Sequence, residues 1–247
     1  MNTARSSFGI SNPFIYLAFC VAALMLLPAA RGEVAPHRKW RNALEPEGKG
    51  PEKIILADDG QALYGILLSA EASSVEKKAA ADLARWLKVM TGAEFTVSNG
   101  APRGPFIAVG SAEFLLQLNP LAADPGLGKG GYAVMVHDGN IYLLGGRGRG
   151  PVNAVYALLE EDLGCRWYAR GTSTIPRRSR LVFRPVPRRF VPVLEIRDPF
   201  FWDAFDAQWS LRNRTNAPNA PVPEKWGGHA NYAGGWFTHT YARLVPP

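Results

Sequence analysis

The stretch GYAVMVHDGNIYLLGGRGRGPVNAVYALLEEDL, residues 131–163, decides the fold class of this chain. Two apolar runs, Tyr132 to Val136 and Ile141 to Leu144, flank an Asp138-Gly139 pair, which a type I′ hairpin turn favours. A glycine-rich loop at 145–150 then leads into an amphipathic helix over Val152 to Leu163. A hairpin followed directly by a helix predicts an α/β fold, with helices packed on a mixed sheet.

The residues before this stretch continue the alternation of strands and helices. Two strands are expected before residue 70, around an Asp-Asp-Gly turn. Ser73 begins the clearest helix, because Glu76 completes a capping box three residues later and Gly92 supplies a stop. This unit therefore has its own strands, helices and apolar core.

The first 32 residues are typical of an export signal. A basic start is followed by an uninterrupted apolar run from Phe14 to Leu27, and Ala30 and Gly32 are small residues at the −3 and −1 positions of a cleavage site. The run is shorter than the roughly 20 residues of a membrane span, although an uncleaved anchor stays an alternative. We expect a secreted or periplasmic protein with a polar linker over 33–52 and no membrane span after signal cleavage.

Length and composition set further limits. The chain has 247 residues, a formal net charge of +7 and 47% hydrophobic residues, which excludes a disordered or collagen-like protein. A complete (β/α)8 barrel needs about 250 residues, so it cannot fit here beside another domain. Only Cys165 remains once the signal is removed, so we predict a buried structural thiol and no internal disulfide.

Cofactor and metal motifs are missing from the sequence. The loop at 145–150 has neither the G-x-G-x-x-G register nor the Lys-Ser/Thr of a P-loop, so a tight turn before a helix is expected. His229 and His239 lie in one Gly- and aromatic-rich segment, where a zinc pair is an alternative to hydrogen-bonded loop histidines. We predict no cofactor and no metal.

Carboxylates are the remaining candidates for chemistry. Glycoside hydrolysis needs two of them, about 5–5.5 Å apart for retention or about 6.5–9.5 Å for inversion. The adjacent acids at 160–162 diverge on a helix and predict a solvated face. Glu195 and Asp198 flank the end of a predicted strand, with Asp203 and Asp206 just beyond, and are either site residues or partners of the abundant arginines.

An arginine-rich stretch follows the α/β unit. Residues 176–189 contain six arginines and three prolines, and the prolines limit the stretch to an edge strand or an extended connector. A structural connector is the first interpretation, attraction to an acidic polysaccharide the second, and nucleic acid the last. We predict no nucleic-acid partner for an exported chain.

The order of elements resembles the accessory domain that precedes the barrel in α-glucuronidases and β-hexosaminidases. Four segments carry the resemblance: 73–92, 106–110, 131–144 and 150–168, the last containing GPVNAVYALLE and LGCRWY. The resemblance covers about residues 53–185. It implies a domain that supports a catalytic barrel and performs no chemistry of its own.

Residues 190–247 resemble the opening of the uncharacterised barrel domain often fused to this domain in secreted bacterial proteins. The residues themselves predict a strand over Val191 to Ile196 and a helix from Phe201 to Arg212. The resemblance implies an incomplete (β/α) barrel start, with its first strand at 195–197, its first helix over 201–216 and the end of its second strand at 236–240. Barrel sites lie at the carboxyl ends of strands. The resemblance thus makes Arg197, Trp202 and His239 the candidates for substrate contact.

The resemblance implies a non-catalytic portion of a secreted glycoside hydrolase-like protein acting on complex glycans. No catalytic residue is assigned, because the family's catalytic carboxylates would lie on later strands. The expected partner is carbohydrate, with an acidic glycan as one option. The alternative is a secreted non-enzymatic module that binds acidic polysaccharide through its arginine-rich segment.

Overall fold

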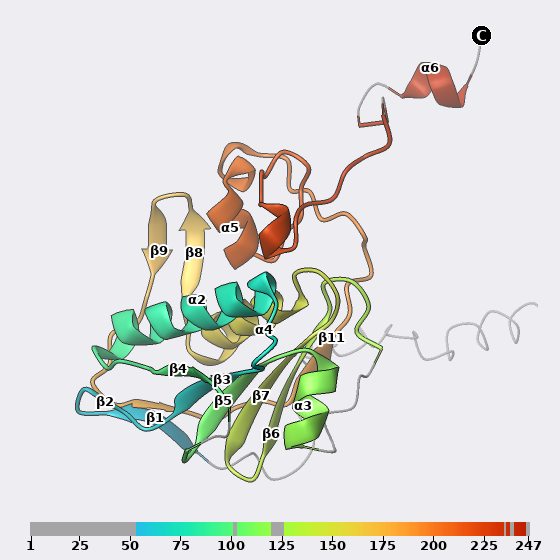
Figure 1. The fold of residues 1–247 in the computed structure, drawn as a ribbon. Coiled ribbons are helices and arrows are strands. Elements are labelled where there is room, and N and C mark those ends of the chain that lie inside the picture. Colours follow the sequence, from blue (N-terminus) through green and yellow to red (C-terminus); the bar gives the residue numbers. More distant parts are fainter. Residues whose placement is uncertain (1–52, 101–102, 120–125, 235, 238–239, 246–247) are drawn as a thin grey trace, which may run out of the picture. The chain divides into compact units, whose positions relative to one another are not determined.

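A six-stranded mixed sheet organises the described part of the chain, which in this computed structural model comprises residues 53–100, 103–119, 126–234, 236–237 and 240–245. The strand order is β11-β6-β7-β5-β3-β4 (Figure 1). The strands are β3 (Gly65–Leu68), β4 (Val97–Asn99), β5 (Phe106–Gly110), β6 (Tyr132–His137), β7 (Asn140–Gly145) and β11 (Arg188–Phe190). β3, β4, β5 and β7 are parallel, β6 is antiparallel to β7, and β11 is antiparallel to β6. The carboxyl ends of β3, β5, β7 and β11 therefore meet at one edge, together with the amino end of β6.

Several sequence predictions lie outside the described residues. These are the export signal over 1–32, the linker over 33–52 and the candidate contact residue His239. In the part of the chain that is described, no helix has the length and apolarity to cross a membrane.

Two smaller sheets complete the β structure. A three-stranded sheet pairs β1 (Ile54–Asp58) with β2 (Gln61–Ala62) on one side and with β10 (Leu181–Phe183) on the other. β8 (Arg166–Ala169) and β9 (Thr172–Thr174) form an antiparallel ribbon. β10 and β11 both come from the arginine- and proline-rich stretch and both lie at a sheet edge, as the prolines require.

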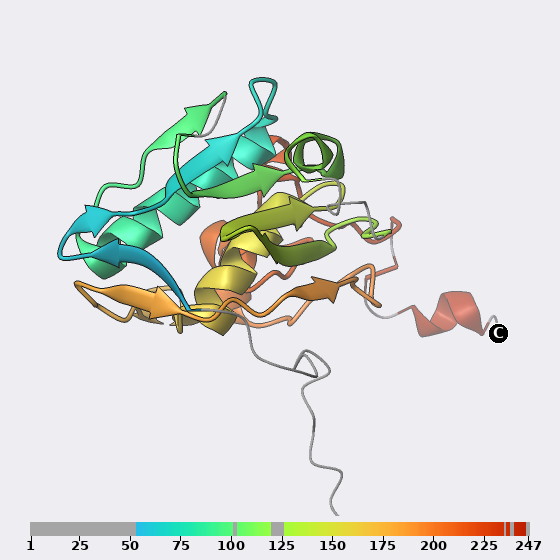
Figure 2. The ribbon, with the colours of Figure 1, turned by 90° about the horizontal axis from the view of Figure 1, so that it is seen from below.

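Helices cover both faces of the main sheet (Figures 1 and 2). The larger core lies under α2 (Ser74–Thr91) and α4 (Gly150–Ala157), whereas α3 (Ala112–Leu118) packs Leu115 against a second, smaller cluster. Edge contacts join Trp86 and Tyr156 to Trp167, with ring centroids 5.9 Å and 5.1 Å apart. The fold class predicted from the sequence, a mixed sheet with helices packed on it, is confirmed.

Local signals fix the ends of these elements. Ser73 and Glu76 form the predicted capping box of α2, and Gly92 ends that helix in the left-handed conformation with φ 78°. The β6–β7 hairpin turns at Asp138 and Gly139, whose φ values of 47° and 73° match a type I′ turn.

The second predicted helix is wrong in its later half. α4 ends at Ala157, and Leu158–Asp162 forms a π-helical turn instead. The prediction of a solvated acidic face fails for Asp162, whose side chain is only 2% exposed and lies 2.6 Å from Nη2 of Arg188. The cause is a tertiary contact: Arg188 lies on β11, later in the chain, and forms an ion pair with Asp162 in the protein interior.

The predicted strand over 191–196 does not form, and no described residue after Phe190 lies in a strand. The backbone N–H of Arg197 donates to the side-chain Oδ1 of Asn216, 2.7 Å away, in place of a strand partner. The predicted helix over 201–212 is split into the 3-10 helix η2 (Trp202–Phe205) and α5 (Ala207–Arg212). Short helices follow at η3 (Glu224–Trp226) and α6 (Tyr241–Leu244).

Two residues of this C-terminal segment belong to the main core. Leu211 on α5 and Val222 before η3 are buried in the same cluster as α2 and α4. The segment therefore lies against the α2 and α4 face of the sheet, above the carboxyl edge of the strands (Figure 1).

Candidate functional site

Three loops meet at the carboxyl edge of the main sheet. They are 127–130 before β6, 145–150 after β7 and 191–197 after β11. The first two are tied together: the N–H of Arg147 donates to the carbonyl of Gly128, and the N–H of Gly130 donates to the carbonyl of Arg147. Because the carboxyl edge of parallel strands is where α/β folds place ligands, this edge is the first place to look for a site.

The glycine loop itself is filled by protein backbone. A Cβ on Gly146 would lie 2.3 Å from the carbonyl oxygen of Gly128, and one on Gly145 would lie 2.1 Å from the nitrogen of Pro151. The glycines thus permit close approach of the chain to itself. This agrees with the predicted tight turn before a helix and leaves no phosphate cradle at that position.

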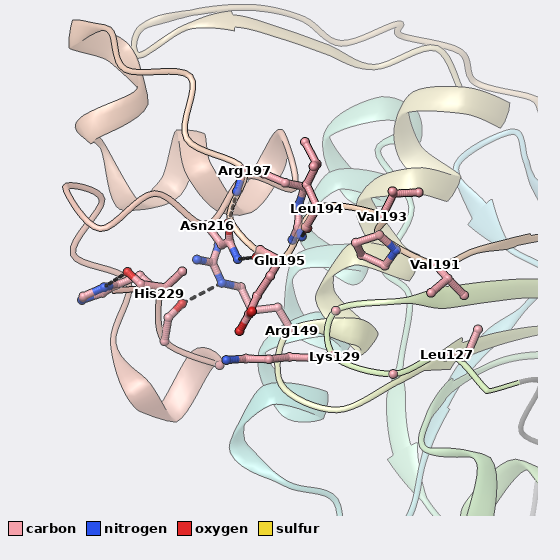
Figure 3. Close-up of a pocket in the computed structure, with 16 residues that line it drawn as sticks. Leu127, Lys129, Arg149, Val191, Val193, Leu194, Glu195, Arg197, Asn216 and His229 are labelled. Atoms are coloured by element: carbon pink, nitrogen blue, oxygen red, sulfur yellow. Dashed lines mark hydrogen bonds between the residues drawn. The ribbon is translucent and has the colours of Figure 1, made fainter. Parts of the chain in front are cut away.

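A pocket of about 300 Å³ opens beside this loop (Figure 3). Figure 3 shows the charged side chains of Lys129, Arg149, Glu195 and Arg197 grouped together, with the apolar Leu127, Val191 and Val193 toward the other side. The full lining is Leu127, Gly128, Lys129, Gly130, Arg149, Val191, Pro192, Val193, Leu194, Glu195, Arg197, Asn216, Gly227, Gly228, His229 and Ala230. The volume is at the lower end for small-molecule pockets, which run from about 300 to 1,000 Å³.

Arg149 is the innermost charge of the pocket. It precedes α4, is only 5% exposed, and donates through Nε to the carbonyl of Gly228 at 2.7 Å and through Nη1 to that of Thr215 at 2.5 Å. Gly227 has a positive φ of 94°, and a Cβ there would lie 2.6 Å from the Arg149 side chain. Burial is the main cause that lowers the pKa of Arg149 to about 10, and the positive charge of Arg197 lowers it further.

Arg197 is the second guanidinium of the pocket. Its Nε donates to the carbonyl of Arg214 at 3.0 Å and its Nη1 to that of Leu194 at 3.1 Å. Asn216 holds the loop on both sides, accepting from the N–H of Arg197 and donating to the carbonyl of Glu195 at 2.8 Å. Burial lowers the pKa of Arg197.

The rest of the lining is less constrained. Lys129 and Glu195 are exposed at the mouth of the pocket, and His229 is half-buried with its Nδ1 3.1 Å from the carbonyl of Ala230. The pocket thus brings together three cations and one carboxylate. It offers an electropositive site with a single acid, not a pair of carboxylates.

A second crevice, of about 740 Å³, lies between the amino ends of α2, α3 and α4. It opens where the connections after β3 and β5 diverge to opposite faces of the sheet, which is a topological switch point. The carboxylate of Glu76 occupies this crevice at the amino ends of the helices, where an external anion would otherwise be favoured. Its Oε2 accepts from the N–H and the hydroxyl of Ser73, both at 2.7 Å, and its Oε1 accepts from the N–H of Ser111 at 2.9 Å.

Of the three predicted contact residues, the structure describes Arg197 and Trp202, and these two lie in different surroundings. Arg197 lies in the pocket, whereas Trp202 is 79% exposed and contacts Phe205 in an aromatic cluster that also holds Phe200. Sequence reasoning missed Arg149, whose place in a glycine loop before a helix was the only available signal.

The candidate acids also differ in their surroundings. Glu195 lies in the pocket, and Oδ2 of Asp198 accepts from the hydroxyl of Tyr232 at 3.3 Å. Asp203 accepts from the N–H of Arg170 at 2.7 Å, and Asp206 caps α5 and pairs with Arg170 at 3.5 Å. These acids are engaged in local structure, apart from Glu195.

Other sequence candidates receive structural roles. Cys165 is fully buried, 3.7 Å from the sulfur of Met90, and burial raises the pKa of its thiol to about 12. Arg188 is buried with Asp162 and so cannot serve an exposed polyanion site. Within the described residues, no three His, Cys, Asp or Glu side chains are grouped so as to hold a metal ion.

Comparison with known proteins finds similarity among solved structures, at low sequence identity. No family model matches the chain, and no curated protein matches it. Among solved structures, it is similar to a family GH115 4-O-methyl-α-glucuronidase with specificity for decorated arabinogalactans, with 17% identity, a TM-score of 0.49, and coverage of 71% of this chain and 29% of that one.

Two hexosaminidase structures are also similar in part. One is a GH20 exo-β-N-acetylglucosaminidase from Vibrio harveyi, with 16% identity, a TM-score of 0.38, and coverage of 59% of this chain and 18% of that one. The other is a mutant β-hexosaminidase from Streptomyces plicatus, with 12% identity, a TM-score of 0.39, and coverage of 62% and 26%. The chain thus spans less than a third of each enzyme's length.

Proposed function

We propose that this chain is the non-catalytic accessory portion of a secreted glycoside hydrolase-like protein that acts on complex glycans. In this proposal residues 53–185 form the accessory domain and residues 190–247 the start of a barrel domain. Arg197 in the pocket and the exposed Trp202 are its points of contact with carbohydrate.

The observation that carries the proposal is the composition of the pocket at the carboxyl edge. It contains one carboxylate, Glu195, among three cations. Hydrolysis of a glycosidic bond needs a second carboxylate at a fixed distance. The acids that follow, Asp198, Asp203 and Asp206, do not line this pocket. Asp198 accepts from Tyr232, Asp203 accepts from the N–H of Arg170, and Asp206 caps α5. The arrangement is suited to binding rather than to turnover.

Trp202 supplies the second element of the proposal. A largely exposed indole presents an apolar face together with an N–H donor, and such amphipathic rings are common at binding surfaces. The apolar C–H face of a pyranose ring can stack on it, with its hydroxyls left in water. Contact of this kind would be insensitive to salt.

The test combines an activity assay with a binding assay on the purified chain. We expect no turnover of aryl glucuronide or aryl hexosaminide, and measurable calorimetric binding of a complex oligosaccharide that Trp202→Ala weakens. Tyr168→Ala is the matched control, because Tyr168 is also an exposed aromatic residue, 61% exposed, outside the pocket. Turnover that disappears in Glu195→Gln would refute the non-catalytic assignment, and equal weakening by both aromatic variants would refute the role of Trp202.

A second candidate function is polyanion binding by the arginine-rich segment. Arg177 and Arg178 lie beside Arg85 and Lys88 around a shallow depression at the end of α2, and all four are exposed. Binding there would release counterions and weaken steeply as salt rises. Titration of heparin at several salt concentrations tests it, with a charge-reversing variant of Arg177 and Arg178 expected to abolish binding.

A further inference from the structure

Arg149 is buried without the partner that such a charge normally has. Its side chain is about nine-tenths or more buried, and two of its donors bind backbone carbonyls. Its remaining guanidinium nitrogen, Nη2, is buried and has no hydrogen-bond partner among the described residues. Removing a charge from water costs several kcal/mol unless it is paired and hydrogen-bonded.

A second guanidinium increases this unfavourable charge. Arg197 lines the same pocket as Arg149, and its positive charge acts on Arg149. Among the residues that the structure describes, neither arginine forms an ion pair with a carboxylate. The negative charge of Glu224 partly offsets the positive charge of Arg149, but Glu224 forms no ion pair with it. Two arginines that share a pocket and form no ion pair with a carboxylate favour an anion from outside.

The remaining lining limits what that anion can be. Leu127 and Val191 give the pocket an apolar side, and Glu195 places one negative charge at its mouth. A strand of nucleic acid or a large polyanion would not fit in about 300 Å³. A small organic molecule with one carboxylate and an attached carbon skeleton matches both the charge and the apolar wall.

We propose that the pocket between Arg149 and Arg197 is a binding site for the carboxylate group of a small organic acid. The planar fork of a guanidinium matches the two oxygens of a carboxylate, which is why arginine is favoured for this recognition. Lys129 at the mouth adds a third positive charge. The carbon skeleton of the ligand then lies against Leu127 and Val191, and ring or chain hydroxyls face Glu195.

This inference deepens the proposed function and rests on it only for the source of the carboxylate. That source is either an acidic sugar of a glycan or a free aliphatic acid. Both share the same chemistry at the arginines, so the experiment includes one probe of each kind.

The experiment is calorimetric and NMR titration of the full chain with D-glucuronate, butyrate and neutral D-glucose. We expect a carboxylate probe to bind at one site and glucose not to bind. Arg197→Gln should weaken binding by about tenfold or more, because it removes a charge-assisted pair of hydrogen bonds. Lys129→Gln, at an exposed position, should weaken it less and is the second variant if Arg197→Gln does not fold.

Arg184→Gln is the matched control, since Arg184 is an exposed arginine outside the pocket and loses the same charge. It should leave binding unchanged within about twofold, as exposed charges contribute little. Arg197→Lys keeps the charge but removes the fork, and should behave like Arg197→Gln if bidentate recognition is correct. Circular dichroism and urea unfolding verify that each variant is folded.

Several results would overturn the inference. No binding of either carboxylate, unchanged binding in both pocket variants, or equal weakening by Arg184→Gln would each exclude a carboxylate site here. Binding of D-glucuronate alone identifies an acidic sugar as the source, and equal binding of butyrate identifies the carboxylate itself. A complex oligosaccharide that binds through Trp202 while both acids fail would refute this inference and leave the proposed function intact.

Discussion

Glu76 holds together the amino ends of two helices, and its removal is the sharpest test of how the carboxyl edge is built. The side chain is 8% exposed and accepts three hydrogen bonds, from the N–H and hydroxyl of Ser73 and from the N–H of Ser111. Ser73 lies before α2, and Ser111 lies before α3 on the opposite face of the sheet. One carboxylate therefore links the two layers of helices.

The expected effect of Glu76→Ala follows from these bonds. A hydrogen bond to a charged group is worth about 1.5–3 kcal/mol, and a helix cap about 1 kcal/mol. Water can reach part of the crevice and replace some of what is lost, so we expect the free energy of unfolding to fall by about 2–4 kcal/mol. Glu76→Gln keeps the volume but loses the charge and one acceptor, and should cost about half as much.

Urea unfolding followed by tryptophan fluorescence measures both variants. Glu113→Gln is the control, because Glu113 lines the same crevice but is exposed, and it should change stability by less than about 0.5 kcal/mol. Added formate or sulfate should partly restore the stability of Glu76→Ala by occupying the vacated position. A loss equal to that of Glu113→Gln, with no rescue by the anion, would refute the view that Glu76 fills an anion site.

Three other predictions follow from buried groups. Arg188→Met leaves the Asp162 carboxylate buried without its ion-pair partner and should lower the free energy of unfolding, measured in urea, by about 3–5 kcal/mol. Adding Asp162→Leu should recover most of that loss, and no recovery in the double variant would contradict this prediction. Burial raises the pKa of the Cys165 thiol to about 12, so Cys165 should resist iodoacetamide at pH 8 until urea unfolds the chain. Peptide mapping by mass spectrometry measures this, and modification of the folded chain would contradict the prediction. Burial also raises the pKa of Tyr132 to about 12, so the stability linked to this group is present below pH 10 and is lost as the pH rises toward 12, by up to about 3 kcal/mol. Urea unfolding at pH 8, 10 and 11 should show a shallower loss in Tyr132→Phe, and an unchanged slope would count against the assignment.

The elements that the sequence predicts well are those with local signals. The capping box of Ser73 and Glu76, the stop at Gly92 and the Asp138-Gly139 turn each lie within a few residues of the structure they specify. Such signals act through backbone geometry that does not depend on the rest of the chain. This is why α2 and the β6–β7 hairpin match the prediction closely.

The elements that it misses depend on partners far along the chain. The sequence predicts a solvated Asp162, because its partner Arg188 lies 26 residues later on β11. The sequence also predicts a strand over the apolar run 191–196, but no described strand forms there. From the sequence Arg149 is an ordinary loop residue. The carbonyls of Thr215 and Gly228, which accept its hydrogen bonds, lie 66 and 79 residues later in the chain. Arg197 could be placed at the site only through a family resemblance that located a strand end near it.

The carboxyl edge of the sheet divides into a closed half and an open half. In the closed half the N–H groups of Ser73 and Ser111, which precede α2 and α3, donate to the chain's own carboxylate, Glu76, so a negative charge already lies at these helix ends. In the open half Arg149 and Arg197 bind only neutral carbonyl and hydroxyl oxygens, which satisfy donors without neutralising charge. Lys129 lines both crevices and adds a cation that Glu76 does not contact. The difference in charge balance, rather than the glycine loop between the two halves, directs an external anion to the arginine pocket.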